Sequence, residues 1–285
     1  MIGRFRESRR RMERLRQAAI LLVLGLGALA MILPFEWMFA TSLSREANVG
    51  MPRFPRLWPP DPSLFNYDIA ATNLPLLRYY LNSIIVVGLS TGGYLLFSSL
   101  TGYAFAKGRF PGRTFFFVAF LTTLLVPFEM RMIPLYLLMR DLHLNNTLPA
   151  LILPFLVGGF GTFLMRQYIS TIPDDLIDAA RLDGAGEFAI YRWVVLPLCV
   201  PVLAALAIIT VIWRWNDILW PLLAISDRSL YTVTLGLAIA GRGSQGIYTG
   251  VALATAALAL LPVIGVYLLL QRHIIRGVTL TGMKG

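Results

Sequence analysis

The sequence has one cysteine and two histidines among its 285 residues. The single thiol, Cys199, cannot form a disulfide within the chain, which excludes a disulfide-stabilised scaffold. Two histidines without a second cysteine are too few for an ordinary zinc site, and we expect no metal site. Charged residues make up only 14% of the chain, whereas a typical soluble domain has roughly a quarter. A soluble enzyme is therefore a poor interpretation.

Motifs of nucleotide binding and catalysis are also missing. A phosphate-binding loop of the form G-x-x-x-x-G-K-[ST] needs a lysine followed by serine or threonine. Both lysines of the chain, Lys107 and Lys284, are followed by glycine. The motif H-E-x-x-H does not occur either. We expect no catalytic residue and no cofactor on this chain, so any ATP that powers it must be bound by another protein.

Apolar residues are abundant, at 57% of the chain, and the mean hydropathy is +0.68. A helix that crosses a bilayer needs about 20 predominantly apolar residues. Six segments meet this criterion: 17–35 (extending to 42), 79–106, 114–139, 148–165, 193–226 and 248–271. The first is too long for the apolar part of a cleaved signal peptide and is interpreted as an anchor. The sequence thus predicts an all-α integral membrane protein with six transmembrane helices.

The distribution of basic residues predicts the orientation. With both termini in the cytoplasm, 16 of the 25 Lys and Arg residues lie on the inner side and seven on the outer side. Such an excess on one side is the usual signature of the cytoplasmic face, so the net charge of +10 does not indicate nucleic-acid binding. The chain divides into a basic cytoplasmic N-terminus (1–16), a first helix (17–42), an outer loop (43–78), a five-helix domain (79–271) and a cytoplasmic tail (272–285). We expect the outer loop to be irregular, because it is rich in proline.

Residues 171–201, here called the elbow segment, lie between the fourth and fifth spans. Pro173 suits the start of a short helix, Gly184 suits a left-handed cap at its end, and a second helix begins near Gly186. Small Ala179 and Ala180 allow another surface to approach closely. Five of the 15 acidic residues gather here: Asp174, Asp175, Asp178, Asp183 and Glu187. These features fit a helix that docks in a groove of a cytoplasmic partner, although an ordinary amphipathic surface helix fits them as well.

A specific resemblance favours the docking interpretation. The motif D-A-A-x-x-x-G at Asp178–Gly184, followed after nine residues by V-x-L-P at Val194–Pro197, resembles the loop of membrane subunits of binding-protein-dependent ABC importers. That loop reads E-A-A-x-x-x-G-x9-I-x-L-P, so the chain departs from it by Asp for Glu and by Val for Ile. Further segments look like the maltose-type carbohydrate uptake family, and specifically its second permease subunit. They are I-P-L-Y at Ile133–Tyr136, N-T-L-P-A-L-I-L-P at Asn146–Pro154, W-N-D-I-L-W-P at Trp215–Pro221 and the C-terminal Q-R-H-I-I-R-G-V-T-L-T-G-M-K-G.

The resemblance implies a fold and a set of partners. It implies the type I permease fold of ABC importers in the inner membrane, with a coupling loop at 166–194. The partners it implies are a homologous permease subunit, two cytoplasmic ATPase subunits that bind ATP and Mg, and an extracytoplasmic substrate-binding protein. In such proteins the stretch 174–187 is the coupling helix seated on an ATPase subunit. The tail residues Met283, Lys284 and Gly285 resemble a tail that reaches toward the ATPase dimer.

Charged residues inside the spans are the candidates for a substrate path, because ionisable groups at membrane depth usually face a cavity or one another. Glu129 and Arg131 lie between Pro127 and Pro134, where a broken helix could turn both toward water. Arg214 and Asp217 are three residues apart and could pair. Trp215 and Asn216 lie between these two, and aromatic rings beside polar groups suit sugar binding. The same residues could instead stabilise contacts between helices, or the partner permease could hold the substrate.

The substrate class remains open at the level of the sequence. A sugar or oligosaccharide is the first interpretation, and Arg131 and Arg214 also suit glycerol phosphate or another anionic sugar derivative. An ion-coupled secondary transporter is the alternative from a different class, but the spans carry no cluster of acidic residues and no inverted repeat. A channel-like membrane subunit is a further alternative.

Overall fold

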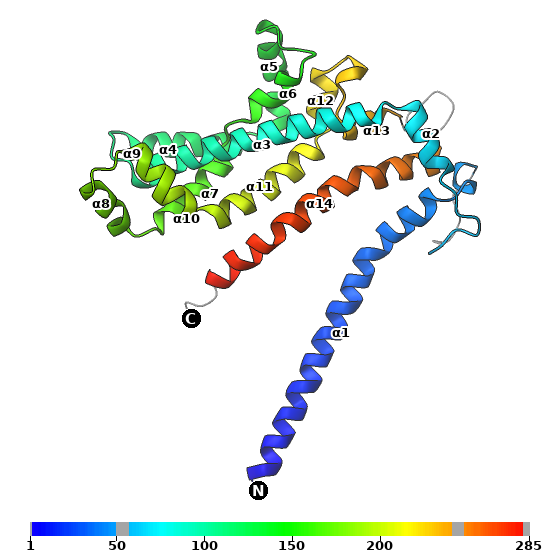
Figure 1. Ribbon diagram of the computed structural model, residues 1–285, viewed down its shortest axis with the longest axis horizontal. Helices are drawn as coiled ribbons and strands as arrows, with labels where there is room; N and C mark the ends of the chain where they lie inside the picture. The colour runs from blue at the N-terminus through cyan, green and yellow to red at the C-terminus, as the bar shows by residue number, and fades with distance from the viewer. Residues whose placement is uncertain (1, 50–56, 241–247, 282–285) are drawn as a thin grey trace. The chain divides into compact units, whose positions relative to one another are not determined.

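The computed structural model describes residues 2–49, 57–240 and 248–281 (Figure 1). All regular elements in these ranges are helices. The chain forms two compact units: one of Met1–Asn73 with Gly241–Leu258, and one of Leu74–Ala240 with Ala259–Gly285. The all-α prediction is therefore confirmed.

The first unit contains α1 (Ile2–Ser42), the 3-10 turn η1 (Glu46–Asn48), α2 (Phe65–Asn73) and the beginning of α14 (Thr249–Thr281). A network of amides joins them around fully buried Asn66. The Asn66 Nδ2 donates to Ser42 O at 2.8 Å and Ser44 O at 2.9 Å, while Asn48 Nδ2 donates to Asn66 Oδ1 at 2.6 Å. Asn48 Oδ1 accepts from Gly250 N at 2.9 Å. Residues 43–49 and 57–78 are thus more ordered than the irregular loop expected from the prolines, because α2 supplies the asparagine that binds the surrounding backbone.

The second unit is built on α3 (Leu76–Lys107), which packs mainly against α7 (Gly159–Ser170) and α11 (Val200–Trp215). Glycines allow α3 and α7 to approach closely. A Cβ on Gly161 would lie 2.2 Å from Ser98 Oγ, and one on Gly102 would lie 2.5 Å from Met165 Cβ. The Gly161 N also donates to Tyr94 Oη at 2.8 Å. These contacts fix α7 along α3.

Among the described residues, three helices are long and apolar enough to cross a membrane, and three bent pairs bring the number to six if each pair forms one span. The long helices are α1, α3 and α14 over the ranges Leu15–Ser42, Leu76–Lys107 and Thr249–Leu269. The bent pairs are Arg113–Leu125 with Phe128–Asp141 (101°), Leu148–Phe155 with Gly159–Ser170 (42°) and Glu187–Leu198 with Val200–Trp215 (76°). Their elements are α4 (Arg113–Thr122), η2 (Thr123–Leu125), α5 (Phe128–Asp141), α6 (Leu148–Ile152), η3 (Leu153–Phe155), α9 (Glu187–Ile190), the π-helical turn η4 (Tyr191–Val195) and α10 (Leu196–Leu198).

The predicted fifth span, 193–226, is wrong as a continuous helix. It bends at Cys199, between Pro197 and Pro201, and α11 ends at Trp215 before the separate α12 (Leu219–Ala224). The helix ends before residues 216–218, where the polar side chains of Asn216 and Asp217 bind the backbone locally. Asn216 Nδ2 donates to Ile212 O at 2.9 Å, and Asp217 Oδ1 accepts from Trp220 N at 3.3 Å.

Two groups of short helices lie at different positions along α3. Around its C-terminal end gather α8 (Asp174–Leu182), α9 and α10 (Figure 1). Elsewhere α5, α6 and α12 pack around fully buried Trp220, whose Nε1 donates to Ala150 O at 2.9 Å. The turn η5 (Arg228–Leu230) and α13 (Val233–Ala240) complete the unit.

Candidate functional site

The elbow segment folds as two short helices joined by a tight turn. Helix α8 ends at Leu182, and Gly184 follows with φ of +82°, in the left-handed region that favours glycine. Ala185 N donates to Ala180 O and Gly184 N donates to Arg181 O, both at 3.0 Å. This is a Schellman cap, in which two final carbonyls of the helix find donors beyond its end. The cap turns the chain into α9, and the predicted elbow at Gly184 is confirmed.

The two faces of α8 differ in what they contact. Ile177 is 1% exposed and belongs to the core cluster at the end of α3, and Ala180 packs against the same cluster. Leu176, Leu182 and Phe188 are 46%, 91% and 73% exposed. Ala180 is partly buried and supports the fold of its own chain, while its expected contact with an ATPase subunit stays a prediction. The outward surface consists of Leu176, Ala179, Leu182 and Phe188.

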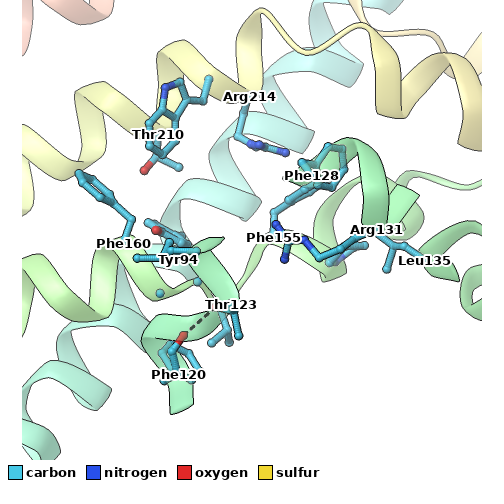
Figure 2. A pocket seen from close by; sticks show the side chains of 16 residues that line it. Tyr94, Phe120, Thr123, Phe128, Arg131, Leu135, Phe155, Phe160, Thr210 and Arg214 are labelled. Atoms are coloured by element: carbon cyan, nitrogen blue, oxygen red, sulfur yellow. Dashed lines mark hydrogen bonds between the residues drawn. The ribbon is translucent and has the colours of Figure 1, made fainter. Parts of the chain in front are cut away.

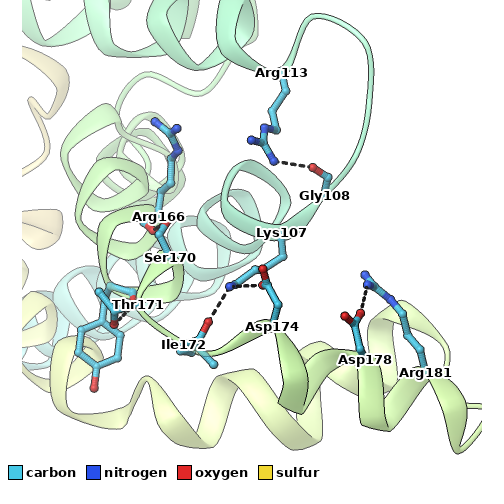
Figure 3. Close-up of polar contacts among 11 residues, drawn as sticks. Lys107, Gly108, Arg113, Arg166, Ser170, Thr171, Ile172, Asp174, Asp178 and Arg181 are labelled. Carbon is cyan, nitrogen blue, oxygen red and sulfur yellow. Dashed lines mark hydrogen bonds and ion pairs between the residues drawn. The ribbon is translucent and has the colours of Figure 1, made fainter.

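Within the described residues, ion pairs engage three of the five acidic residues of the elbow segment, and Figure 3 shows those of Asp174 and Asp178. Arg181 NH1 lies 3.0 Å from Asp178 Oδ1, and Arg181 NH2 lies 2.9 Å from Glu187 Oε1. Lys107 Nζ lies 2.6 Å from Asp174 Oδ1, and the hydrogen bond from Lys107 lowers the pKa of Asp174 below its usual 3.8. Asp175 and Asp183 are exposed and form no ion pair with any residue that the structure describes. These two carboxylates remain available to a partner.

A cavity of about 450 Å³ opens between α3, α5, α7 and α11 (Figure 2). Its volume is in the range of roughly 300–1,000 Å³ that is typical of small-molecule sites. Aromatic side chains dominate its lining, joined by the hydroxyl groups of Thr123 and Thr210. The aromatic residues are Tyr94, Phe120, Phe128, Phe155, Phe160 and Trp213. Such a lining offers ring faces together with a few hydrogen-bonding groups.

Arg214 and Asp217 form the pair that their spacing predicts. Arg214 NH1 donates to Asp217 Oδ2 at 3.3 Å, and the two side chains are only 18% and 16% exposed. The guanidinium also stacks on Phe155, 3.7 Å from the ring centroid. Figure 2 shows Arg214 directed toward the aromatic rings. The charge of Arg214 is therefore balanced by Asp217 within the chain.

The break predicted around Glu129 and Arg131 occurs at Pro127, which precedes α5, whereas Pro134 lies inside α5. Arg131 lines the cavity and lies 5.8 Å from the Phe128 ring centroid. Arg131 forms no ion pair with another residue in the described part of the chain. Glu129 lies apart from the cavity, in an adjoining hollow that also contains Asn216 and Asp217. Both hollows share Phe128, Trp213 and Arg214.

Trp215 lies outside both linings. Its side chain is 6% exposed, and its Nε1 donates to Ala259 O at 3.0 Å. It packs with Tyr79, Val87 and Val233, which makes it a helix-packing residue. Tyr94, Phe120, Phe155 and Phe160 were not predictable as lining residues, because an aromatic residue in an apolar span carries no sign of which side it faces. The predicted tail residues Met283, Lys284 and Gly285 lie outside the described residues.

Residues 95–280 match the family of binding-protein-dependent transport system inner membrane components. The chain belongs to this family. It is a multi-pass permease subunit of an ABC importer complex in the inner membrane, and the ATPase of such a complex is a separate chain. The family assignment from the elbow motif is confirmed, and the ion-coupled and channel-like alternatives are set aside.

Three comparisons describe what the permease is similar to. It is 41% identical over 203 residues to the arabinooligosaccharides transport system permease protein AraQ of Halalkalibacterium halodurans, with 71% of each chain covered. It is 34% identical over 268 residues to the sn-glycerol-3-phosphate transport system permease protein UgpE of Brucella suis, with 91% of this chain and 95% of UgpE covered. A crystal structure of a bacterial ABC transporter involved in the import of the acidic polysaccharide alginate has a chain that matches with a TM-score of 0.79 and 27% identity. That match covers 92% of this chain and 97% of the other.

Proposed function

We propose that the permease imports a sugar or oligosaccharide and is driven through its elbow segment by cytoplasmic ATPase subunits. The complex would contain a homologous permease subunit, two ATPase subunits that bind ATP and Mg, and an extracytoplasmic substrate-binding protein. The proposal rests mainly on the exposure of the outward surface of the elbow segment, formed by Leu176, Ala179, Leu182 and Phe188. The chain that carries this surface belongs to the importer family. The cavity provides the second support, since it offers a substrate a place within the membrane-spanning unit.

The elbow segment suits docking because one face of α8 packs against the core cluster and the opposite face is exposed. Ile177 and Ala180 fasten α8 to the core cluster, so the helix keeps its position without a partner. Leu182 and Phe188 remain exposed in the same segment as Asp175 and Asp183, whose carboxylates pair with no residue that the structure describes. Exposed apolar side chains rimmed by charge mark protein interaction sites. We assign this surface to the contact with an ATPase subunit, with the tail at 283–285 as a further contact.

The aromatic cavity supports carbohydrate as the substrate class. Sugar rings present C–H faces that pack on aromatic side chains. Their hydroxyl groups can donate to the hydroxyl oxygens of Thr123 and Thr210, which themselves donate to Phe120 O at 2.7 Å and Leu206 O at 2.8 Å. The arabinooligosaccharide system of AraQ is a carbohydrate system by its name. Glu129, Asn216 and Asp217, in the adjoining hollow, are the polar part of the proposed path.

Arg131 supports an anionic sugar derivative or glycerol phosphate as the second candidate. Its guanidinium reaches the cavity without a carboxylate partner among the described residues, whereas Arg214 is neutralised by Asp217. An exposed guanidinium in a cavity lining suits a phosphate or carboxylate. The named substrates of UgpE and of the alginate importer are anionic, which agrees with this candidate.

We further propose that both termini lie in the cytoplasm, together with the elbow segment. The excess of basic residues on that side supports this orientation. A topology reporter inserted near Asp61 should be active only on the outer side of the membrane. Activity of that reporter in the cytoplasm would contradict the proposed orientation.

The coupling assignment can be tested with Leu182→Asp and Ala179→Glu, which place charge on the outward surface of α8. We expect the permease to reach the membrane in normal amounts but to lose its ATPase subunits on purification. Leu182→Met is the matched control, because it keeps an apolar side chain of similar volume and should retain them. Normal ATPase retention and uptake in both charged variants would overturn the assignment.

The substrate class can be tested in proteoliposomes that contain the complete complex. Arabino-oligosaccharides serve as neutral probes and sn-glycerol 3-phosphate as the anionic probe. ATP-dependent uptake of the neutral probes supports the first candidate, and uptake of the anionic probe alone replaces it with the second. Trp213→Ala should reduce uptake of whichever probe enters, because Trp213 lines both hollows.

A further inference from the structure

We propose that three polar residues of α3, Ser99, Tyr103 and Lys107, transmit movement of the elbow segment along α3 to the cavity. This inference rests on the proposed docking of the elbow segment to an ATPase. It adds that α3 is the helix that receives the movement, and that these three residues connect α3 to the elbow segment.

The three residues recur at intervals of four along the last turns of α3. Side chains four residues apart lie on the same face of an α-helix, one above the other. Ser99, Tyr103 and Lys107 therefore form a single polar stripe, which we call the α3 stripe. Ser99 and Tyr103 are buried, and the side chain of Lys107 is only 8% exposed.

Each member of the α3 stripe binds a different part of the elbow segment. Ser99 Oγ lies 2.7 Å from Tyr191 Oη, within hydrogen-bonding distance. Tyr103 Oη donates to Glu187 Oε2 at 2.7 Å, and its ring lies 5.7 Å from that of Tyr191. Lys107 Nζ donates to Asp174 Oδ1 as described above. The stripe thus contacts η4, α9 and α8 in turn.

These contacts hold the elbow segment on both sides of the turn at Gly184. Lys107 Nζ also donates to Ile172 O at 2.6 Å, just before α8 begins (Figure 3). After the turn, Tyr103 binds Glu187 and Ser99 binds Tyr191. Within the elbow, Arg181 joins Asp178 of α8 to Glu187 of α9. A force on α8 would therefore move the two short helices and the end of α3 together.

Helix α3 is suited to carry this movement because it runs unbroken from Leu76 to Lys107. The covalent route from the elbow segment leads instead through η4, which is π-helical, and through the bend of 76° at Cys199 into α11. Tyr94 of α3 lines the cavity, 13 residues before Lys107, which is about 20 Å along a helix. The α3 stripe and the cavity are thus joined by one straight element.

The test uses the complete complex and needs no knowledge of the substrate. A Cys199→Ala, Thr123→Cys background places one reactive thiol in the cavity lining. The probe is a membrane-impermeant maleimide, and the readout is the change in its reaction rate when ATP is added. The test variant adds Tyr103→Phe and Lys107→Met, which remove the polar atoms and keep the apolar bulk. The matched controls are Thr101→Val, which loses a hydroxyl contact from α3 to Thr162 of α7, and Arg113→Met, which loses a base near the end of α3.

We expect the ATP-dependent change in labelling to fall about five-fold or more in the test variant, which is the lower end of typical coupling between sites. ATPase subunits should remain bound and continue to hydrolyse ATP. Both controls should respond as the background does, and Lys107→Arg with Tyr103 intact should retain most of the response.

Three results would overturn the inference. An unchanged response in the test variant would show that α3 does not receive the movement through the stripe, while the docking proposal would stand. Loss of ATPase subunits from the test variant alone would show that the stripe only maintains the docking surface. Loss of the ATP response in the background and both controls would overturn the docking proposal together with this inference.

Discussion

Lys107, in the last turn of α3, lies 2.6 Å from Asp174 at the start of α8, and this ion pair joins a membrane-spanning helix to the elbow segment. The two side chains differ greatly in exposure, at 8% for Lys107 and 75% for Asp174. The lysine therefore reaches out from the packed end of α3, and the aspartate meets it at the surface. Their contact predicts how the elbow segment responds to pH.

The first prediction concerns the pH dependence of this ion pair. Lys107 lowers the pKa of Asp174 below its usual 3.8, so the stabilisation is fully present above that value and is lost as the pH falls through the lowered pKa. We expect Asp174→Asn to lower the midpoint of thermal unfolding of the purified complex by the same amount at all pH values from about 5 to about 8. The difference should shrink only below about pH 4. A difference that already disappears near neutral pH would contradict the pairing.

The second prediction concerns the turn at Gly184. Its φ of +82° strains any residue with a Cβ by about 1–2 kcal/mol, and a β-branched residue by more. Gly184→Val should reduce uptake sharply while membrane abundance stays normal, because α8 is tilted relative to its partner. Gly186→Val is the matched control, since Gly186 has φ of −71° and no atom lies within 4 Å of the added Cβ at either position. Equal uptake in the two variants would show that the left-handed turn has no role in coupling.

The third prediction concerns Arg214 and Asp217 beside the cavity. Removing one partner of a buried pair leaves the other charge uncompensated, which typically costs about 3–5 kcal/mol. Asp217→Asn should therefore lower the midpoint of thermal unfolding strongly. The double variant Arg214→Gln, Asp217→Asn should recover much of the loss. If the double variant is less stable than Asp217→Asn by the full cost of Arg214→Gln alone, the two residues do not stabilise each other.

The fourth prediction concerns Arg131 and the charge of the substrate. If the substrate is anionic, Arg131→Gln should remove a charged hydrogen bond worth about 1.5–3 kcal/mol, and apparent affinity should fall about ten-fold or more. Uptake of neutral oligosaccharides should change little. Arg140→Gln on the same helix is the control, because Arg140 is 60% exposed and pairs with its neighbour Asp141. Unchanged uptake of the anionic probe in Arg131→Gln would exclude a role for Arg131 in the path.

The sequence allowed the elbow to be located because the rules that form it are local. A glycine at the end of a short helix predicts a left-handed cap, and Gly184 has one. The pairing of Arg214 with Asp217 was predictable for the same reason, since a spacing of three places side chains together. The family could be recognised because its motif has a fixed spacing through this segment.

Other features depend on contacts between distant parts of the chain. The spacing of residues on α8 did not reveal that Ala180 would pack inward and Leu182 outward, because the core cluster that selects the face comes from α3, α7 and α11. Trp215 and Trp213 are two residues apart on α11, and tertiary packing turns the first toward Ala259 and the second toward the cavity. The aromatic lining likewise gathers from six elements, which are α3, α4, α5, η3, α7 and α11.

The α3 stripe illustrates the same limit. Ser99, Tyr103 and Lys107 were visible as polar residues near the end of a span, but their partners lie 65 to 92 positions away. No local rule connects such residues. Only the folded chain shows that each of them meets the elbow segment.

The measurement that most directly tests the central claim is site-specific photocrosslinking from position 182 in the assembled complex. Leu182 is 91% exposed on the outward surface, and a photoreactive amino acid there should form a covalent adduct with an ATPase subunit. The same amino acid at Leu89, which is 59% exposed on the membrane-spanning helix α3, should give no adduct with the ATPase. If the elbow segment docks on an ATPase subunit, the ATPase adduct forms from position 182 and not from position 89. Absence of that adduct from a complex that retains its ATPase subunits and imports its substrate would contradict it.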